Sequence, residues 1–192
     1  PPSLTSNLFP SGLTFGSDPA SPDRATIGGV LGNNATGAHS ILYGMAHDHL
    51  LEAEVVLSDG SLVSFMSQDR AGLKNLQNRS TLEGKIYQKL PELINKYQDE
   101  INRQYPKTFR NVAGYNLNIL SKQKKINPAS LMAGSEGTLG IITSAKLNLV
   151  LIPAYTTLYL IHFNDLRPSL ECVPEILSTQ PSAVELIDDT LI

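Results

Sequence analysis

Glycine is concentrated near the beginning of this 192-residue chain, and half of the 14 glycines lie between Gly12 and Gly44. Glycine is needed where the backbone takes a positive φ or must approach a ligand closely. No Lys or Arg occurs from Ala25 to Asp69, so an anion or a planar ring system bound here would be held by backbone amides, hydroxyl groups and Asn side chains. The spacing matches neither a dinucleotide fingerprint nor a phosphate loop ending in Gly-Lys. Tight turns that pack a helix on a sheet explain the cluster equally well.

A second glycine cluster stands far along the chain. Gly134, Gly137 and Gly140 recur every three residues and lead into an apolar stretch that begins at Ile141. The missing side chains leave room for a ligand against the backbone, and Glu136 within the turn is placed to accept hydrogen bonds from it. The alternative is an ordinary helix-to-strand turn with Glu136 in solvent.

The composition excludes several classes of protein. With 15 basic and 18 acidic side chains the net charge is -3, which argues against a nucleic-acid-binding protein. The single Cys172 excludes a disulfide framework and a cysteine-based zinc or iron–sulfur site within this chain. No apolar run approaches the roughly 20 residues that a membrane span needs. We therefore expect a soluble, cytoplasmic protein with no membrane span.

The apolar pattern predicts a mixed α+β chain after an irregular lead-in over residues 1–23, which are rich in Pro, Ser and Gly. Up to residue 152 we expect the following elements, in chain order: a short helix capped by Thr26, a hairpin of strands 50–57 and 62–65, a helix over 81–103 with a break or kink near Leu90 ahead of Pro91, a short helix that ends at Leu120, a helical turn starting with Pro128, and a strand over 139–150.

The pattern changes sharply at Pro153. Residues 156–163 are strand-like, residues 168–177 helical, and residues 183–187 strand-like again. This β-α-β order predicts the beginning of a different structural unit.

The histidines invite a metal hypothesis. His47 and His49 are two apart, with His39 upstream, but a metal site needs three or four converging ligands and a second shell. Ordinary hydrogen-bonded histidines are the better interpretation, and we predict no metal site. The chain has no Gly-x-Ser-x-Gly elbow, so no hydrolytic centre is expected.

Several sequence blocks together resemble a known family. The blocks are Asp18-Pro-Ala-Ser21, Ala25-Thr-Ile-Gly-Gly29, Asn34-Ala-Thr-Gly37, Tyr43-Gly44, Arg110-Asn-Val-Ala-Gly-Tyr115-Asn-Leu117 and Gly134-Ser-Glu-Gly-Thr-Leu-Gly140-Ile141. In this order they are similar to the FAD-linked oxidases of the vanillyl-alcohol oxidase superfamily, the group of the glycolate oxidase D-subunit, D-lactate dehydrogenase and D-2-hydroxyglutarate dehydrogenase. The helical insert over 80–103 is similar to large members that carry a C-terminal iron–sulfur region.

The resemblance implies a division into two units. Residues 1–152 correspond to the C-terminal part of a PCMH-type FAD-binding domain, an antiparallel sheet flanked by helices, and the upstream subdomain with the pyrophosphate loop is absent from this chain. Residues 153–192 correspond to the start of a ferredoxin-like cap domain, in which Ser182-Ala-Val-Glu-Leu186 matches a block. Any iron–sulfur cluster would belong to the rest of the protein.

The resemblance also implies the site residues. Lining the flavin and pyrophosphate we expect Pro19, Ser21, Thr26, Gly28, Gly29, Asn34, Ala35 and Gly37. Along the adenosine and ribityl part we expect Glu136, Gly137, Gly140 and Ile141. Candidates for the substrate side of the ring are His39, Arg110 and Tyr115, whose alternative role is hydrogen bonding within the loops. The catalytic base and any metal ligands of the family lie outside this chain.

The implied function is oxidation of a D-2-hydroxy acid by hydride transfer to FAD, followed by electron transfer to an unidentified acceptor. The chain alone is expected to hold FAD weakly or not at all, to be inactive, and to self-associate as a homodimer through an exposed apolar face. The alternative is a non-catalytic binding or interaction module on the same scaffold. A metal-dependent enzyme that uses His39, His47 and His49 is a third and weaker hypothesis.

Overall fold

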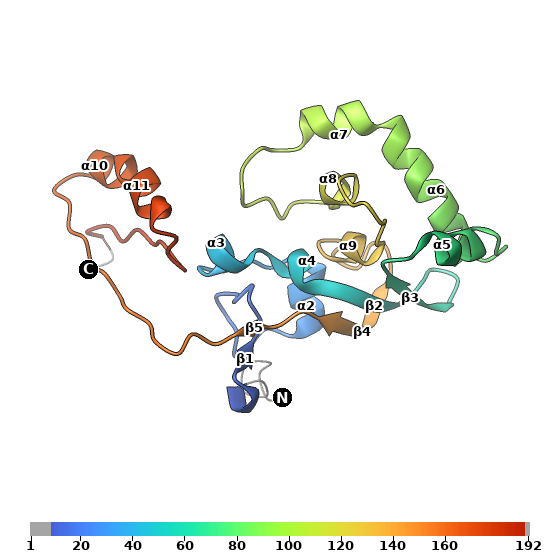
Figure 1. Cartoon of the computed structure of the whole chain (residues 1–192), viewed down its shortest axis with the longest axis horizontal. Helices are drawn as coiled ribbons and strands as arrows, with labels where there is room; N and C mark the ends of the chain where they lie inside the picture. Colours follow the sequence, from blue (N-terminus) through green and yellow to red (C-terminus); the bar gives the residue numbers. More distant parts are fainter. Residues whose placement is uncertain (1–8, 191–192) are drawn as a thin grey trace.

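A computed structural model describes residues 9–190. Its centre is a three-stranded antiparallel sheet in the order β3-β2-β4 (Figure 1). The strands are β2 (Leu50–Val56), β3 (Leu62–Met66) and β4 (Ile141–Leu147). A second, two-stranded sheet pairs β1 (Leu13–Thr14) with β5 (Val150–Leu151). The predicted hairpin and the predicted strand after the second glycine cluster are both confirmed.

Helices cover one face of the central sheet, where alternate strand residues are buried. Val55 of β2 pairs with Val63 of β3 and with Ile142 of β4, and the exposed fraction of Val55 is 0%. Phe65 meets Tyr87 edge to face, with ring centroids 6.2 Å apart. The covering helices are α2 (Ile27–Gly32), α4 (Ala46–His49), α5 (Arg70–Gln77), α6 (Leu82–Lys96) and α9 (Ala129–Met132), which contribute to one hydrophobic core with the sheet.

The remaining short elements before the tail are η1 (Phe9–Ser11), α3 (Ser40–Tyr43), α7 (Gln98–Gln104) and α8 (Leu117–Leu120). The predicted irregular lead-in therefore contains one turn of 3-10 helix and a two-residue strand in its described part, and residues 1–8 of that prediction lie outside the described residues. Pro128 immediately precedes α9 as its N-cap, one position before the predicted place.

No break forms near Leu90, because α6 continues through Pro91 to Lys96 and the helix ends at Tyr97. A kink at this position stays a prediction. Proline cannot donate to the carbonyl four residues earlier, which here belongs to Tyr87. The side chain of Gln77, from α5, donates to that carbonyl instead, with Nε2 to oxygen 3.1 Å. A side chain from the neighbouring helix thus satisfies the acceptor that the proline leaves open.

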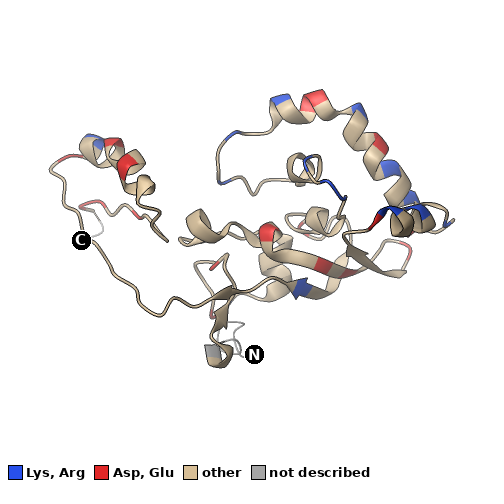
Figure 2. Cartoon of the chain, viewed as in Figure 1, with Lys and Arg blue, Asp and Glu red and all other residues tan. Residues whose placement is uncertain are grey.

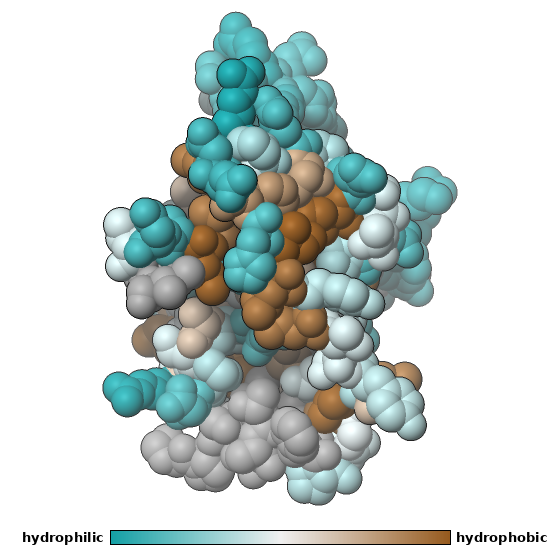
Figure 3. Space-filling model, turned by 90° about the vertical axis from the view of Figure 1, so that its left-hand side faces the viewer, coloured by the Kyte–Doolittle hydropathy of each residue, from teal (hydrophilic) through white to brown (hydrophobic). Residues whose placement is uncertain are grey.

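Beyond Ile152 the chain leaves the sheet and runs to two short helices, α10 (Leu166–Glu171) and α11 (Val173–Ser178), which lie apart from the rest of the fold in Figure 1. The helical prediction is confirmed, but the strands predicted over 156–163 and 183–187 are not formed. A strand is stabilised by hydrogen bonds to a neighbour, and neither segment has one. As a consequence, this segment exposes large apolar side chains, which include Tyr155, Leu158, Tyr159, Leu160 and Ile161. Figure 3 shows a hydrophobic patch on the face of the molecule that is turned to the viewer.

Candidate functional site

The two glycine clusters meet in space although they are about 100 residues apart in sequence. The amide of Gly134 donates to the carbonyl oxygen of Leu31 at 3.0 Å, and the amide of Glu136 donates to that of Gly32 at 2.9 Å. Both acceptors lie at the C-terminal end of α2, which ends in the first cluster. The residues predicted from the two clusters therefore belong to one surface.

Asn34 holds the turn that follows α2. Its φ is +52°, a left-handed conformation that Asn adopts more readily than most residues. Its fully buried side chain accepts two hydrogen bonds through Oδ1, from the amide of His47 at 2.9 Å and from the ring Nδ1 of His47 at 3.1 Å. Asn34 thus fixes the first cluster to α4.

Gly37 is required by a close backbone contact. A Cβ at this position would lie 1.6 Å from the carbonyl oxygen of Asp18, so no other residue fits. Its amide donates to Oγ of Ser40 at 3.0 Å, and that hydroxyl donates to the carbonyl oxygen of Ser17 at 3.2 Å. The segment at 17–18 is therefore packed directly on the loop that contains Gly37.

Two of the three predicted substrate-side residues lie on this loop. Nδ1 of His39 is 2.5 Å from Oδ2 of Asp18, and both side chains are about two-fifths exposed, 43% and 41%. Arg110 donates from Nη2 to the carbonyl oxygen of Gly37 at 2.9 Å. Each group is thus both hydrogen-bonded within the loops and in contact with solvent.

The third substrate-side candidate, Tyr115, lies with the second cluster instead. Its hydroxyl is 3.0 Å from Oγ1 of Thr138, and its carbonyl oxygen accepts a hydrogen bond of 2.6 Å from the hydroxyl of Tyr105. The loop from 105 to 116 therefore spans both glycine clusters, with Arg110 on one and Tyr115 on the other.

The other predicted cofactor residues differ in their exposure to solvent and in the space around them. Thr26 caps α2 by accepting from the amide of Gly29 at 3.2 Å, and a Cβ at Gly28 would meet nothing within 4 Å. Gly140 is packed tightly, since a Cβ there would lie 2.6 Å from Cγ1 of Val55. The surface they form contains exposed Ser21, Thr26, Gly28, Gly29, Glu136, Gly137 and Ile141 and half-buried Pro19, Ala35 and Gly140.

The groups on this surface fit a ligand that is bound mainly by neutral hydrogen-bonding groups. Helices α2 and α3 carry no charged side chain (Figure 2). Buried side-chain atoms without a hydrogen-bond partner include Oγ of Ser17, Nδ2 of Asn34 and Oγ1 of Thr36, and such groups are costly unless a partner is supplied. Our sequence reasoning missed Ser17 and Thr36, and the signal available was a small hydroxyl residue beside each glycine turn.

The histidines do not form a metal centre. His39 lies against Asp18 and His47 against Asn34, while the ring of His49 contacts the carbonyl oxygens of Tyr43 at 2.9 Å and Asn148 at 3.2 Å. Among residues 9–190, no group of three or more His, Cys, Asp or Glu side chains is arranged to hold a metal ion.

One carboxyl group near the site has a shifted pKa. Asp48 accepts from the amide of Met45 at 2.8 Å and lies 3.2 Å from Nε2 of His47. Partial burial alone would raise the pKa of Asp48, but hydrogen bonds from His47 and Met45 and the charges of His47 and His49 outweigh it and lower the pKa below its ordinary value of 3.8.

Comparison with known proteins shows what this chain is similar to. Residues 2–65 match the family model described as "FAD binding domain". The matched residues contain the first glycine cluster. Together with relatives that match along nearly the whole chain, this match confirms the predicted resemblance to the FAD-linked oxidases.

The relatives match along almost the whole chain. A D-2-hydroxyglutarate dehydrogenase of Pseudomonas putida is 30% identical over 190 residues, which is 98% of this chain and 19% of that protein. The mitochondrial D-lactate dehydrogenase [cytochrome] 1 of Saccharomyces cerevisiae is 25% identical, over 98% of this chain and 24% of that protein. The chain thus spans about a fifth to a quarter of the length of these two relatives.

A solved structure shares the fold. The chain aligns with alkyldihydroxyacetonephosphate synthase with a TM-score of 0.53 and 21% identity, over 94% of this chain and 24% of that one. The predicted fold class, helices flanking an antiparallel sheet in a PCMH-type FAD-binding domain, is confirmed, and the ferredoxin-like cap stays a prediction.

Proposed function

We propose that this chain is part of an FAD-dependent oxidoreductase that oxidises a D-2-hydroxy acid, and that the two glycine clusters together form its share of the FAD site. The observation that carries the proposal is the pair of backbone hydrogen bonds, from Gly134 to Leu31 and from Glu136 to Gly32, that joins the clusters. The match of residues 2–65, which include the first cluster, to the FAD-binding domain model supports FAD as the cofactor.

The proposed roles follow the two halves of this surface. The first cluster, with Thr26, Gly28 and Asn34, would contact the flavin and pyrophosphate through backbone and neutral side chains. The second cluster, with Glu136 and Gly137, would lie along the adenosine and ribityl part. Positive φ values of +48° at Glu136 and +80° at Gly137 turn the backbone at this point, which exposes main-chain groups to a ligand.

When bound, FAD would supply the acceptor for the hydride that leaves the α-carbon of the hydroxy acid. The hydroxyl proton would go to a base in the rest of the protein, and the product would be the 2-oxo acid. In this chain, His39 and Arg110 would face the substrate; the proposal is supported by their hydrogen bonds at the Gly37 loop and their partial exposure to solvent. The acceptor that reoxidises the flavin remains unidentified.

The division into residues 1–152 and 153–192 is part of the same proposal. The amide of Ile152 donates to the carbonyl oxygen of Gly12 at 3.0 Å, next to the β1–β5 pair that closes the first unit. The segment that follows exposes its apolar side chains and forms no strand, as expected for part of a unit whose remaining strands lie elsewhere. Self-association through this apolar segment is a further proposal.

Two features of the chain bear on its cellular location. No helix within residues 9–190 is long and apolar enough to cross a membrane. We propose a reducing compartment because the chain has a single cysteine, and the cytoplasm stays the predicted one although the yeast relative is named as mitochondrial.

The visible absorption spectrum of the intact protein tests the proposed function. We expect a bound flavin whose absorbance is bleached, without oxygen, by D-2-hydroxyglutarate or D-lactate and not by the L-enantiomer. A protein that stays colourless after incubation with FAD would overturn the cofactor assignment and favour the non-catalytic binding module. A flavin that no 2-hydroxy acid reduces would overturn the substrate class alone.

A further inference from the structure

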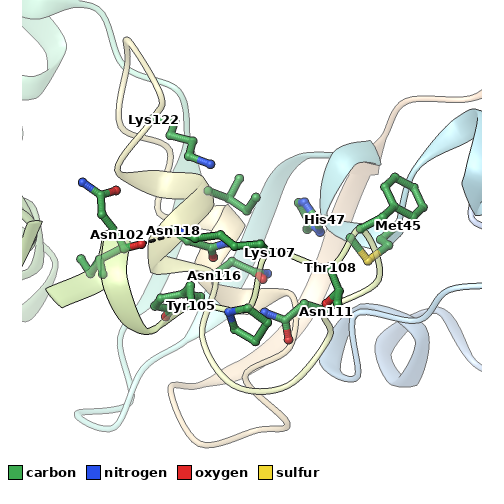
Figure 4. A pocket seen from close by; sticks show the side chains of 14 residues that line it. Met45, His47, Asn102, Tyr105, Lys107, Thr108, Asn111, Asn116, Asn118 and Lys122 are labelled. Atoms are coloured by element: carbon green, nitrogen blue, oxygen red, sulfur yellow. Dashed lines mark hydrogen bonds between the residues drawn. The ribbon is translucent and has the colours of Figure 1, made fainter. Parts of the chain in front are cut away.

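A cavity adjoins the surface formed by the glycine clusters, because Asn116 in its lining donates to the carbonyl oxygen of Ala133, the residue before Gly134. It has a volume of about 260 Å³ and is lined by residues of α7, α8, α4 and the 105–111 loop (Figure 4). Its size suits a small metabolite rather than a cofactor such as FAD. The polar residues that line it include His47, Asn102, Tyr105, Lys107, Asn111, Asn116, Asn118 and Lys122.

The lining is cationic and rich in amides. Lys107 and Lys122 contribute two positive charges, and no Asp or Glu lines the cavity. The ammonium group of Lys107 donates to the carbonyl oxygen of Asn102, which holds it at the wall. An unopposed positive charge beside neutral hydrogen-bond donors favours an anionic ligand.

The side-chain amides of the lining determine which hydrogen-bonding groups a ligand must carry. Nδ2 of Asn116 donates both its protons inside the protein, to the carbonyl oxygens of Ser130 at 3.2 Å and Ala133 at 2.8 Å. Asn116 is therefore left with an acceptor, its Oδ1, to offer to a ligand. A ligand that matches the whole lining has carboxylate oxygens for the lysines and a hydroxyl donor for an amide oxygen.

From this lining we infer that the cavity, which adjoins the proposed FAD site, is a binding site for a small hydroxy-carboxylate anion. The cavity and the FAD site are connected through His47, which lines the cavity and is hydrogen-bonded to Asn34 of the first glycine cluster. An anion bound in the cavity therefore contacts the residue that anchors the proposed flavin loop. Binding of the anion does not require flavin.

Calorimetric titration of the chain at low ionic strength tests this inference, with malate, succinate, succinamide and inorganic phosphate as probes. We expect malate to bind most tightly, succinate more weakly because it lacks the hydroxyl, and neutral succinamide not at all. The affinity for malate should fall as salt is added. Phosphate binding more tightly than malate, or no malate binding at millimolar concentration, would overturn the proposal.

Two variants with matched controls locate the binding. Asn118→Asp places a carboxylate in the cavity without a change of size, and we expect it to abolish malate binding, whereas Asn95→Asp on the exposed side of α6 should leave it unchanged. Lys122→Gln should weaken binding about tenfold, and Lys85→Gln should not. If malate binds to both cavity variants as tightly as to the unsubstituted chain, the proposed binding site is wrong. If Asn118→Asp does not fold, the affinity of Lys122→Gln for malate is the deciding measurement. Because these titrations contain no flavin, their outcome is independent of the FAD proposal.

Discussion

Arg110 donates from its guanidinium Nη2 to the carbonyl oxygen of Gly37 at 2.9 Å, and this bond ties the 105–116 loop to the first glycine cluster. Gly37 is itself packed against the carbonyl of Asp18, so three separate segments of the chain meet at one point. Tyr115 on the same loop reaches Thr138 beside the second cluster. The loop therefore connects the two halves of the proposed site through hydrogen bonds to both glycine clusters.

Replacing Arg110 tests this connection. We expect Arg110→Ala to lower the free energy of unfolding by about 1 kcal/mol, the usual worth of a hydrogen bond from a charged donor at a partly exposed position, and to weaken FAD binding to the intact protein. Arg103→Ala removes an arginine that pairs with the exposed Glu100, and should change stability by about 0.5 kcal/mol or less. Equal effects of the two substitutions, measured by urea unfolding and flavin titration, would contradict the role of Arg110.

Two glycines of the first cluster should respond oppositely to alanine. In Gly37→Ala the new methyl group would collide with the Asp18 carbonyl oxygen, and we expect a loss of about 3 kcal/mol in the free energy of unfolding. In Gly28→Ala the methyl group enters open space on a helix, and a gain of about 0.5–1 kcal/mol is expected from helix propensity. Thermal unfolding of both variants checks the prediction, which fails if they shift the midpoint in the same direction.

The lowered pKa of Asp48 gives a pH dependence with a definite sign. A carboxyl whose pKa is lower in the folded state stabilises the protein above its ordinary pKa of 3.8 and loses that contribution as the pH falls through the folded value. We expect Asp48→Asn to cost about 0.5–1 kcal/mol at pH 7, at the lower end because the side chain is 47% exposed. The cost should shrink as the pH falls below 3.8 and the carboxyl group becomes protonated in the folded protein.

Urea unfolding at several pH values measures this difference. Asp189→Asn, in the exposed C-terminal segment, serves as the control and should match the unsubstituted chain throughout. An Asp48→Asn penalty that stays constant down to pH 2 would show that the ionised carboxylate is not what stabilises α4.

A double-mutant cycle tests how α6 passes through a proline. Gln77→Ala leaves the Tyr87 carbonyl oxygen without its donor, and we expect a loss of about 1 kcal/mol. In the Pro91→Ala background the backbone amide restored at position 91 donates to that carbonyl, so Gln77→Ala should cost much less. Additive effects of the two substitutions would disprove the compensation, and Gln98→Ala, which removes a weak 3.4 Å contact to Asn102, is the control.

Local signals in the sequence predicted much of the fold. Thr26 caps α2 and Thr81 caps α6 through their side chains, and the Asp59-Gly60 turn sets the hairpin. Helix α5 was missed, although Asp69 caps it by accepting from the amide of Gly72 at 2.7 Å. A capping aspartate followed by Leu73 and Leu76 is the local signal that indicates this helix.

The errors arose where a distant residue decides the outcome. The continuity of α6 depends on Gln77 from another helix, and periodicity around Pro91 carries no information about it. Likewise, residues 156–163 have a strand-like pattern, but a strand forms only where a partner is present. The sequence blocks predicted both glycine clusters, while the hydrogen bond from Glu136 to Gly32 that unites them could be seen only in the folded chain.

The affinity of the intact protein for FAD tests the central claim most directly, because that claim is that the cofactor lies against the open backbone at Gly28. Gly28→Leu fills this open space at an exposed helical position, whereas Gly60→Asn changes a glycine of the distant hairpin turn, at a positive φ of +80° that Asn tolerates. Flavin titration should show FAD binding weakened about tenfold or more in Gly28→Leu and unchanged in Gly60→Asn. Equal FAD affinity in the two folded variants would contradict the proposed site.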